Sequence, residues 1–211
     1  ETAVDNAFQS KEKIQGEYSQ KAYQEISKAS ETLSNLGITV HMFEDKGLKT
    51  PDSVFPNNWL STHSSGSVVL YPMKPISRRL ERRQDIIQML QSKYEVNEII
   101  DYSEFESSNL FLEGTGSMVF DHLNHVVYVS ESSRTHLTVL DHFCKKFDYE
   151  PIVFSAKDEN EITVYHTNVL MCVGTKIALV GFDMITDELK KKEIVYKLKN
   201  TGHEIIHLNN K

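Results

Sequence analysis

Three polar residues of this sequence have side chains that together could bind a polar planar group and move protons: Asn58, Glu113 and His166. Positions 58 and 113 are 55 residues apart, and positions 113 and 166 are 53 apart. A carboxylate and an imidazole can move protons, and an amide can hold a polar planar group. Taken singly, a glutamate before Gly114 can cap a turn, and a histidine at a strand start is often structural. The nearly equal spacing favours a shared role.

The elements around these residues repeat in the order strand, turn, strand, helix, strand. In the middle copy, residues 117–120 and 126–129 predict a hairpin, and residues 151–154 predict the closing strand. Ser133 can cap the helix between them. The apolar residues of that helix keep helical spacing: Leu137, Leu140, Cys144 and Phe147.

The same order recurs on both sides of the middle copy, with predicted helix starts at Ser77, Ser133 and Thr186. A partial copy stands at the front, where a helix ends at Gly37 and residues 38–43 extend. One face of this front helix is apolar: Ala22, Ile26, Ala29 and Leu33. The chain therefore contains three whole units and one partial unit.

Repeated units of this kind favour an α/β fold closed into a propeller-like ring, which brings equivalent loops together at its axis. An open, doubly wound α/β sheet is the alternative. No Pro-, Gly- or Ser-rich linker divides the chain, so we expect a single domain over residues 1–211. The hairpin of the partial front copy would have to lie before Glu1. We therefore expect that the N-terminal part of this domain is missing from the sequence.

The composition argues against several classes of partner. The net charge is −7, and no basic stripe suggests nucleic-acid binding. The positive cluster at Arg78, Arg79, Arg82 and Arg83 is interpreted as a solvated helix face. No run of 18 apolar residues predicts a membrane span, and no signal peptide is visible. We expect a cytoplasmic protein, and the sequence leaves open whether it is a homo-oligomer.

Four short motifs resemble those of the pentein superfamily, the arginine deiminases and amidinotransferases. Residues 112–114, Leu-Glu-Gly, resemble the start of the family motif Leu-Glu-Gly-Gly-Asp. Residues 166–168 resemble His-x-Asp, residues 55–58 resemble Phe-x-Arg-Asp, and residues 132–135 resemble Gly/Ser-x-Arg-Thr. The four motifs follow the same order as in the family and keep the same place in the repeated units, and the resemblance covers most of the chain. The resemblance implies a pentein β/α-propeller of ββαβ units around a pseudo-fivefold axis, and the nearest subgroup is the bacterial arginine-deiminase-related citrulline hydrolases.

The resemblance also implies roles for individual residues. Glu113 and His166 would be the catalytic acid–base pair around the guanidino or ureido carbon. The substrate would be held by three amides and one guanidinium: Asn57, Asn58, Asn168 and Arg134. Arg134 would clamp the α-carboxylate, because its planar fork matches a carboxylate. The alternative for Arg134 is an ion pair on a helix face.

Two departures from the family pattern bear on the substrate. Asn58 and Asn168 stand where guanidine-processing relatives usually have aspartates, and amides suit a neutral ureido group. We therefore predict a hydrolase acting on citrulline or a close analogue, with an arginine deiminase or amidinotransferase as the alternative. Thr115 and Gly116 stand where the family motif has Gly and Asp, so the resemblance does not identify which residues hold Glu113 in place.

The family's nucleophilic cysteine belongs to a C-terminal unit that we expect to lie outside this chain. Cys144 and Cys172 both fall in apolar segments and are predicted to be core residues. The expected mechanism is covalent, with a cysteine thiolate attacking the substrate, and needs no metal or organic cofactor. A relative without the thiolate would instead be a non-catalytic module that binds amino acids or a protein.

A zinc hydrolase is a weaker alternative. His122, His125 and His136 are close in sequence, but the first two fall in a predicted turn and no further ligand spacing completes a site. A serine hydrolase is weaker still, because Gly-x-Ser-x-Gly is absent.

Overall fold

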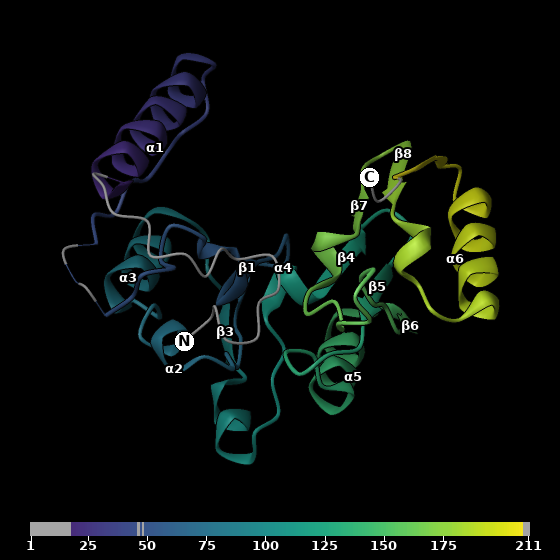
Figure 1. Ribbon diagram of the computed structural model, residues 1–211. Coiled ribbons are helices and arrows are strands. Elements are labelled where there is room, and N and C mark those ends of the chain that lie inside the picture. The colour runs from purple at the N-terminus through teal and green to yellow at the C-terminus, as the bar shows by residue number, and fades with distance from the viewer. Residues whose placement is uncertain (1–17, 46, 48, 209–211) are drawn as a thin grey trace.

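The computed structural model describes residues 18–45, 47 and 49–208, which form a mixed α/β fold with three small sheets (Figure 1). Each sheet has three strands, which lie side by side in the order in which they occur along the chain. The first and second strands pair antiparallel as a hairpin, and the third pairs parallel to the second. The strands are β1 (Leu60–Thr62), β2 (Ser67–Leu70), β3 (Glu98–Asp101), β4 (Met118–Asp121), β5 (Val126–Ser130), β6 (Glu150–Phe154), β7 (Met171–Val173), β8 (Ile177–Val180) and β9 (Glu204–His207).

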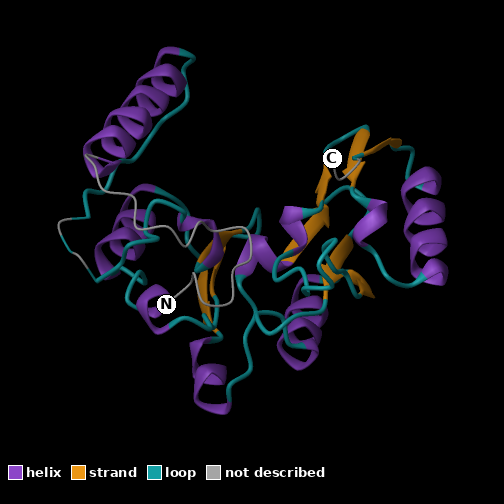
Figure 2. Ribbon diagram, viewed as in Figure 1, coloured by secondary structure: helices purple, strands orange, loops and turns teal. Residues whose placement is uncertain are grey.

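A helix joins the second strand of each sheet to the third, as a parallel connection requires (Figure 2). These helices are α3 (Gln84–Lys93), α5 (Leu137–Phe147) and α6 (Glu188–Asn200). The remaining helical segments are α1 (Tyr18–Asn35), α2 (Ile76–Arg79), α4 (Gly114–Ser117), η2 (Pro56–Asn58), η3 (Ser103–Ser108), η4 (Thr167–Val169) and η5 (Phe182–Met184). The α/β class and the strand–strand–helix–strand order are confirmed, and the closed ring stays a prediction.

The predicted helix starts are wrong in detail. Ser77 lies in the short α2, and α3 begins only at Gln84. His136, not Ser133, caps α5, with its ring nitrogen accepting from the amide of Thr138 at 3.2 Å. Asp187 caps α6 and accepts from the amides of Leu189 and Lys190. Several polar residues precede each helix, so the sequence alone did not identify the cap.

The front helix ends as predicted. Gly37 adopts a φ of +83°, where a side chain would be strained, and the amide of Ile38 closes the helix on the carbonyl of Leu33 at 3.1 Å. Residues 38–43, predicted to extend, form none of the described strands. The helix α1 projects away from the sheets (Figure 1), and its apolar face is exposed.

The core consists of three apolar clusters that lie between and beneath the sheets. One cluster joins Val119 and Tyr128 of the second sheet to Ala178 of the third and Ile194 of α6. A second joins Val69 of the first sheet to α5. Each fully buried aliphatic side chain contributes about 1.5–3 kcal/mol, so these clusters hold neighbouring units together. None of the described helices has the length and apolarity of a membrane span.

The two cysteines differ in their environment. Cys144 on α5 is buried in the second cluster, as predicted. The prediction for Cys172 is wrong, because Cys172 is exposed on β7. Its strand is apolar, but no described segment covers that face of the third sheet.

Candidate active site

Glu113 and His166 meet in the interior of the protein. The imidazole Nε2 of His166 lies 2.8 Å from Oε2 of Glu113, and the side chains are 6% and 0% exposed. Glu113 immediately precedes α4, and His166 immediately precedes η4. The helix α4 lies at the centre of Figure 1, between the first sheet and the other two. The predicted convergence of loops from successive units is therefore observed for these two residues.

Asn58 lies against the same short helix. A Cβ placed on Gly116 would be 2.8 Å from Nδ1 and Cε1 of His166 and 3.1 Å from Nδ2 of Asn58. Such distances leave no room for a side chain. A side chain at position 116 would therefore displace His166 or Asn58.

Arg134 completes the buried group. Its Nη1 lies 3.4 Å from Oε2 of Glu113, and its guanidinium carbon lies 4.8 Å from the ring centroid of Tyr165. The side chain is 2% exposed. Arg134 belongs to the loop before α5 and not to a helix, so the alternative of a helix-face ion pair is wrong.

The charges around the pair favour a carboxylate beside a neutral imidazole. Burial alone would raise the pKa of Glu113, but the hydrogen bond from His166, the charges of His166 and Arg134 and the amide of Lys74 hold this pKa below its ordinary value. Burial lowers the pKa of His166, and its contact with Glu113 only partly offsets this. A neutral His166 donates its Nε2 proton to Glu113, which leaves Nδ1 as a basic nitrogen on the edge facing Gly116.

The other predicted substrate-binding amides lie farther out. Asn57 is exposed and donates from Nδ2 to Oγ1 of Thr115 at 3.2 Å, while Thr115 donates back to the carbonyl of Asn57 at 2.9 Å. These bonds fasten the loop of Asn58 to α4. Asn168 is exposed on η4, although Thr167 beside it is buried. The structure thus groups Asn58, Glu113, Arg134 and His166, with Asn57 at the rim and Asn168 outside.

The interpretation of the Arg78–Arg83 cluster as a solvated helix face is wrong for Arg78. Its guanidinium is buried, donates to both carboxylate oxygens of Glu81 at 3.1 and 3.0 Å, and donates to the carbonyl of Phe55 at 2.6 Å. Because Phe55 precedes Asn57 and Asn58, this buried ion pair anchors the loop that brings Asn58 to the site. No pattern in the sequence indicated this contact, because α2 packs against a segment far from it in the chain.

Other supporting residues were also missed. The backbone amide of Lys74 donates to Oε1 of Glu113 at 3.0 Å, and Nζ of Lys74 donates to Ser133 at 2.8 Å. Ser117 and Thr167 are buried beside the pair. These residues belong to no motif that can be recognised in a single sequence, so the sequence analysis did not identify them.

Neither cysteine is bonded to the pair in the part of the chain that the structure describes. Burial raises the pKa of the Cys144 thiol to about 12, which leaves it protonated near neutral pH. The histidines of the zinc alternative have other partners: His122 contacts the hydroxyl of Tyr149, His125 the carbonyl of Asp148, and His136 caps α5. Within the described ranges, no group of three or more metal-ligating side chains is found.

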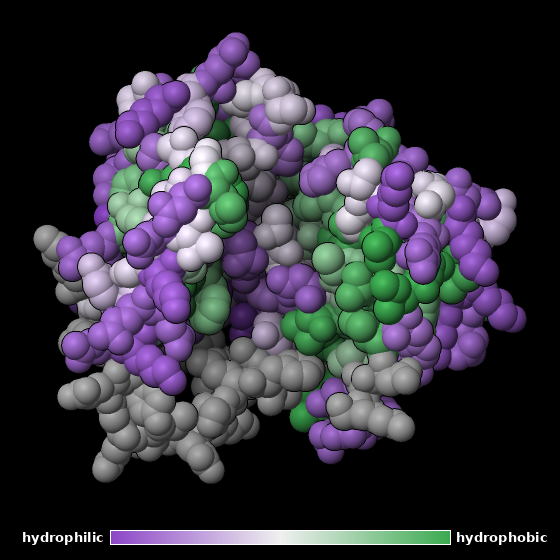
Figure 3. Space-filling view, turned by 90° about the horizontal axis from the view of Figure 1, so that it is seen from above, coloured by the Kyte–Doolittle hydropathy of each residue, from purple (hydrophilic) through white to green (hydrophobic). Residues whose placement is uncertain are grey.

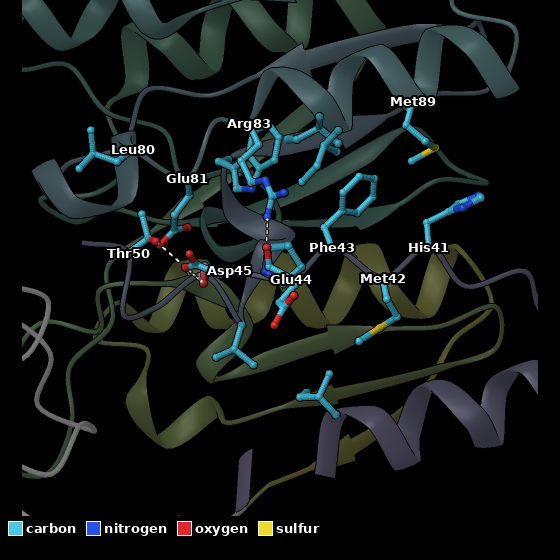
Figure 4. Close-up of a pocket in the computed structure, with 17 residues that line it drawn as sticks. His41, Met42, Phe43, Glu44, Asp45, Thr50, Leu80, Glu81, Arg83 and Met89 are labelled. Carbon is cyan, nitrogen blue, oxygen red and sulfur yellow. Dashed lines mark hydrogen bonds between the residues drawn. The ribbon is translucent and has the colours of Figure 1, made fainter. Parts of the chain in front are cut away.

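A separate pocket of about 700 Å³ lies beside the loop of Asn58, between residues 41–45 and α3 (Figure 4). Its lining is largely apolar, with Phe43, Trp59 and Met89 among its residues, and Glu81 reaches it from the buried ion pair. None of the six predicted site residues lines this pocket.

The chain is similar to known proteins in sequence and in fold. The profile of the family described as N,N dimethylarginine dimethylhydrolase, eukaryotic, matches residues 1–211. No curated protein matches the chain. A substrate-bound mutant of the N-terminal domain of ArgZ, an arginine dihydrolase from the ornithine–ammonia cycle in Cyanobacteria, is similar in fold, with 19% identity, a TM-score of 0.68, and coverage of 89% of this chain and 65% of that one. This chain therefore spans less than two thirds of that relative.

Two further solved structures are similar in fold. A mutant of AgrE in complex with L-arginine is 17% identical, with a TM-score of 0.68 and coverage of 91% of this chain and 29% of that one. A dimethylarginine dimethylaminohydrolase adduct with 4-chloro-2-hydroxymethylpyridine is 15% identical, with a TM-score of 0.61 and coverage of 90% and 68%.

Proposed function

Because this chain belongs to the eukaryotic N,N-dimethylarginine dimethylhydrolase family of the pentein superfamily, we propose that it carries the acid–base machinery of a hydrolase acting on the guanidino or ureido carbon of an arginine-like amino acid. The observation that supports this most is the buried contact of 2.8 Å between Glu113 and His166. A buried carboxylate hydrogen-bonded to a neutral imidazole can accept and donate protons at a reacting group.

The proposed reaction is a covalent hydrolysis. A cysteine thiolate forms a bond to the substrate carbon, and the carbon–nitrogen bond to the departing amine breaks as that nitrogen takes a proton from the Glu113–His166 pair. Water then attacks the carbon–sulfur intermediate, gives a proton back to the pair and releases the thiolate. Since Cys144 and Cys172 do not meet the pair, we propose that the thiolate comes from sequence outside these 211 residues.

For the substrate we propose citrulline or a close analogue. Asn58 is buried within the site, and an amide there can both donate to and accept from a neutral ureido group. A cationic guanidinium would instead favour a carboxylate at this position. We propose that Arg134 binds the α-carboxylate and that Asn57 borders the substrate site. Hydrolysis of citrulline would yield ornithine, carbon dioxide and ammonia.

A guanidino substrate is the second candidate. It is favoured by the family description, which names dimethylarginine, and by the arginine complexes of proteins with a similar fold. The same pair could protonate a departing amine or methylamine, so the chemistry of Glu113 and His166 does not separate the two candidates. The side chain at position 58 is what distinguishes them, because an amide suits a ureido group and a carboxylate suits a guanidinium.

We also propose that the three units belong to a single pentein domain with a five-unit ring. The cross-strand row Val119, Tyr128 and Ile152 of the second sheet is buried against the third unit. The equivalent row of the third sheet, Cys172, Leu179 and Ile206, has exposed ends. Figure 3 displays apolar side chains on the right-hand side, the side of the third unit, next to a hollow that separates the two halves of the molecule. A further unit packed on this row would continue the ring.

The experiment is a substrate panel with the natural protein that contains these residues. Citrulline, arginine and dimethylarginine are supplied in turn, and ornithine, ammonia and citrulline are quantified. Release of ornithine from citrulline supports the ureido proposal, and formation of citrulline from either guanidino substrate supports the second candidate. Binding of these amino acids without any turnover would contradict both and favour a binding module.

A further inference from the structure

Ser117 lies at the end of α4 and connects the segments that carry the site residues. It is 0% exposed. Its hydroxyl accepts from the amide of Glu113 at 3.1 Å and from Oγ1 of Thr135 at 2.8 Å, and donates to the carbonyl of Arg134 at 3.0 Å. A serine hydroxyl has one donor and two acceptor positions, so all of its hydrogen-bonding capacity is used.

The backbone of Ser117 makes the connection to the third segment. Its carbonyl accepts from Oγ1 of Thr167 at 2.5 Å, and the same Oγ1 accepts from the amide of Ser130 at 2.7 Å. Thr167 is fully buried and directly follows His166. One residue therefore fastens the loops of Glu113, Arg134 and His166 to each other, although these loops belong to different parts of the chain.

We propose that Ser117 is a positioning residue that sets the placement of Glu113 relative to Arg134 and His166, with Thr167 as its partner on the histidine side. Its catalytic consequence rests on the proposed function. The positioning itself does not, because it concerns only the geometry of the buried pair. Proton transfer depends on placement to a fraction of an ångström, so a buried anchor of this kind controls the rate without touching substrate.

Removal of the hydroxyl has a defined local effect. In Ser117→Ala, Oγ1 of Thr135 loses an acceptor, and the carbonyl of Arg134 loses one of its donors. The amide of Glu113 keeps only its longer bond of 3.3 Å to the Arg134 carbonyl. Buried groups that lose a partner shift to find another, and the shift is passed to Glu113 and Arg134.

Ser130 provides a matched control. It is also 0% exposed, lies on β5 close to Thr167, and its hydroxyl has no hydrogen-bond partner among the described residues. The substitution Ser130→Ala therefore makes the same chemical change in the same environment without removing a link to the site. Its backbone amide still donates to Thr167.

The test uses proton NMR of the natural protein to follow the Nε2 proton of His166. A hydrogen bond from a buried imidazole to a carboxylate moves this resonance downfield and slows its exchange with water. We expect the resonance in the wild type and in Ser130→Ala, and its loss or upfield movement in Ser117→Ala. An unchanged resonance in a folded Ser117→Ala protein would overturn the proposal.

A second variant covers the case in which Ser117→Ala does not fold. Thr167→Val keeps the shape of the side chain and removes the bonds to Ser117 and Ser130. We expect the same resonance to move, and an unchanged resonance overturns the proposal. With a turned-over substrate, kcat of Ser117→Ala should fall about 10- to 100-fold while that of Ser130→Ala stays within about 2-fold. If no substrate is turned over, the NMR result still decides the positioning proposal, and only the proposed function fails.

Discussion

Nε2 of His166 and Oε2 of Glu113 are 2.8 Å apart, although 53 residues of sequence separate them. The contact joins two loops that each enter a different three-stranded sheet. It places a carboxylate with a lowered pKa beside an imidazole with a lowered pKa. Asn58 and Arg134 flank this contact, so the proposed binding groups and the proposed proton-transfer pair share one buried site.

The first prediction concerns pH and stability. The pKa of His166 is lowered in the folded protein, mainly by burial, so the unfolded protein binds a proton first as the pH falls. The stability contributed by the neutral His166 is thus present above its ordinary pKa of about 6.5 and decreases below it, by at most about 1.4 kcal/mol per pH unit. Urea unfolding of the natural protein at pH 7 and pH 5 measures this loss.

The variant His166→Gln should show a smaller decrease over the same pH range than the wild type. The pKa of Glu113 is also lowered, against the effect of burial, by its bonds to His166 and to its other partners, and its stability contribution is lost only below its ordinary value of about 4.5. Equal pH dependence in His166→Gln and wild type would contradict the account.

The second prediction concerns Gly116. A methyl group at this position would be 2.8 Å from the ring of His166 and must displace it. We expect Gly116→Ala to lower kcat at least about 10-fold, because displacement of a proton-transfer group is costly. Gly174→Ala is the control, since its new methyl would meet only the carbonyl oxygen of Ile177 at 3.4 Å. Steady-state kinetics compare the two, and equal rates would show that His166 does not need its observed position.

The third prediction concerns substrate choice. Asn58→Asp places a buried carboxylate where we propose that the ureido group binds. The ratio of kcat/KM for citrulline to that for arginine should fall by about 10-fold or more, which corresponds to about 1.4 kcal/mol. Asn200→Asp makes the same change at an exposed position on α6, outside the site, and should leave this ratio within about 2-fold. A ratio unaffected by Asn58→Asp argues against the role of Asn58.

The sequence was sufficient to predict the meeting of Glu113 and His166, because a repeated order of elements places equivalent loops at equivalent positions. It was not sufficient for details that depend on tertiary packing. Ser133 and His136 both precede α5, and only the three-dimensional path of the loop decides that His136 caps the helix. Arg78 was placed in solvent because its partner carbonyl, on Phe55, lies 23 residues away.

Two other differences have similar causes. An apolar strand indicates burial only if another segment covers it, and no described segment covers Cys172. Ser117 has no feature in the sequence that distinguishes it from other serines, because its importance comes from four hydrogen bonds to residues of three different loops. Single-sequence patterns identify chemical groups more readily than the residues that hold them.

The most direct test of the central claim, that the Glu113–His166 pair transfers protons in hydrolysis, is the turnover of citrulline and of arginine by Glu113→Gln. This variant keeps the size of the side chain and removes its charge. We predict that kcat/KM of the preferred substrate falls by about 10²- to 10⁴-fold, while Glu98→Gln, a change at a glutamate with 43% exposure, stays near wild type. Wild-type turnover by a folded Glu113→Gln protein would contradict the claim.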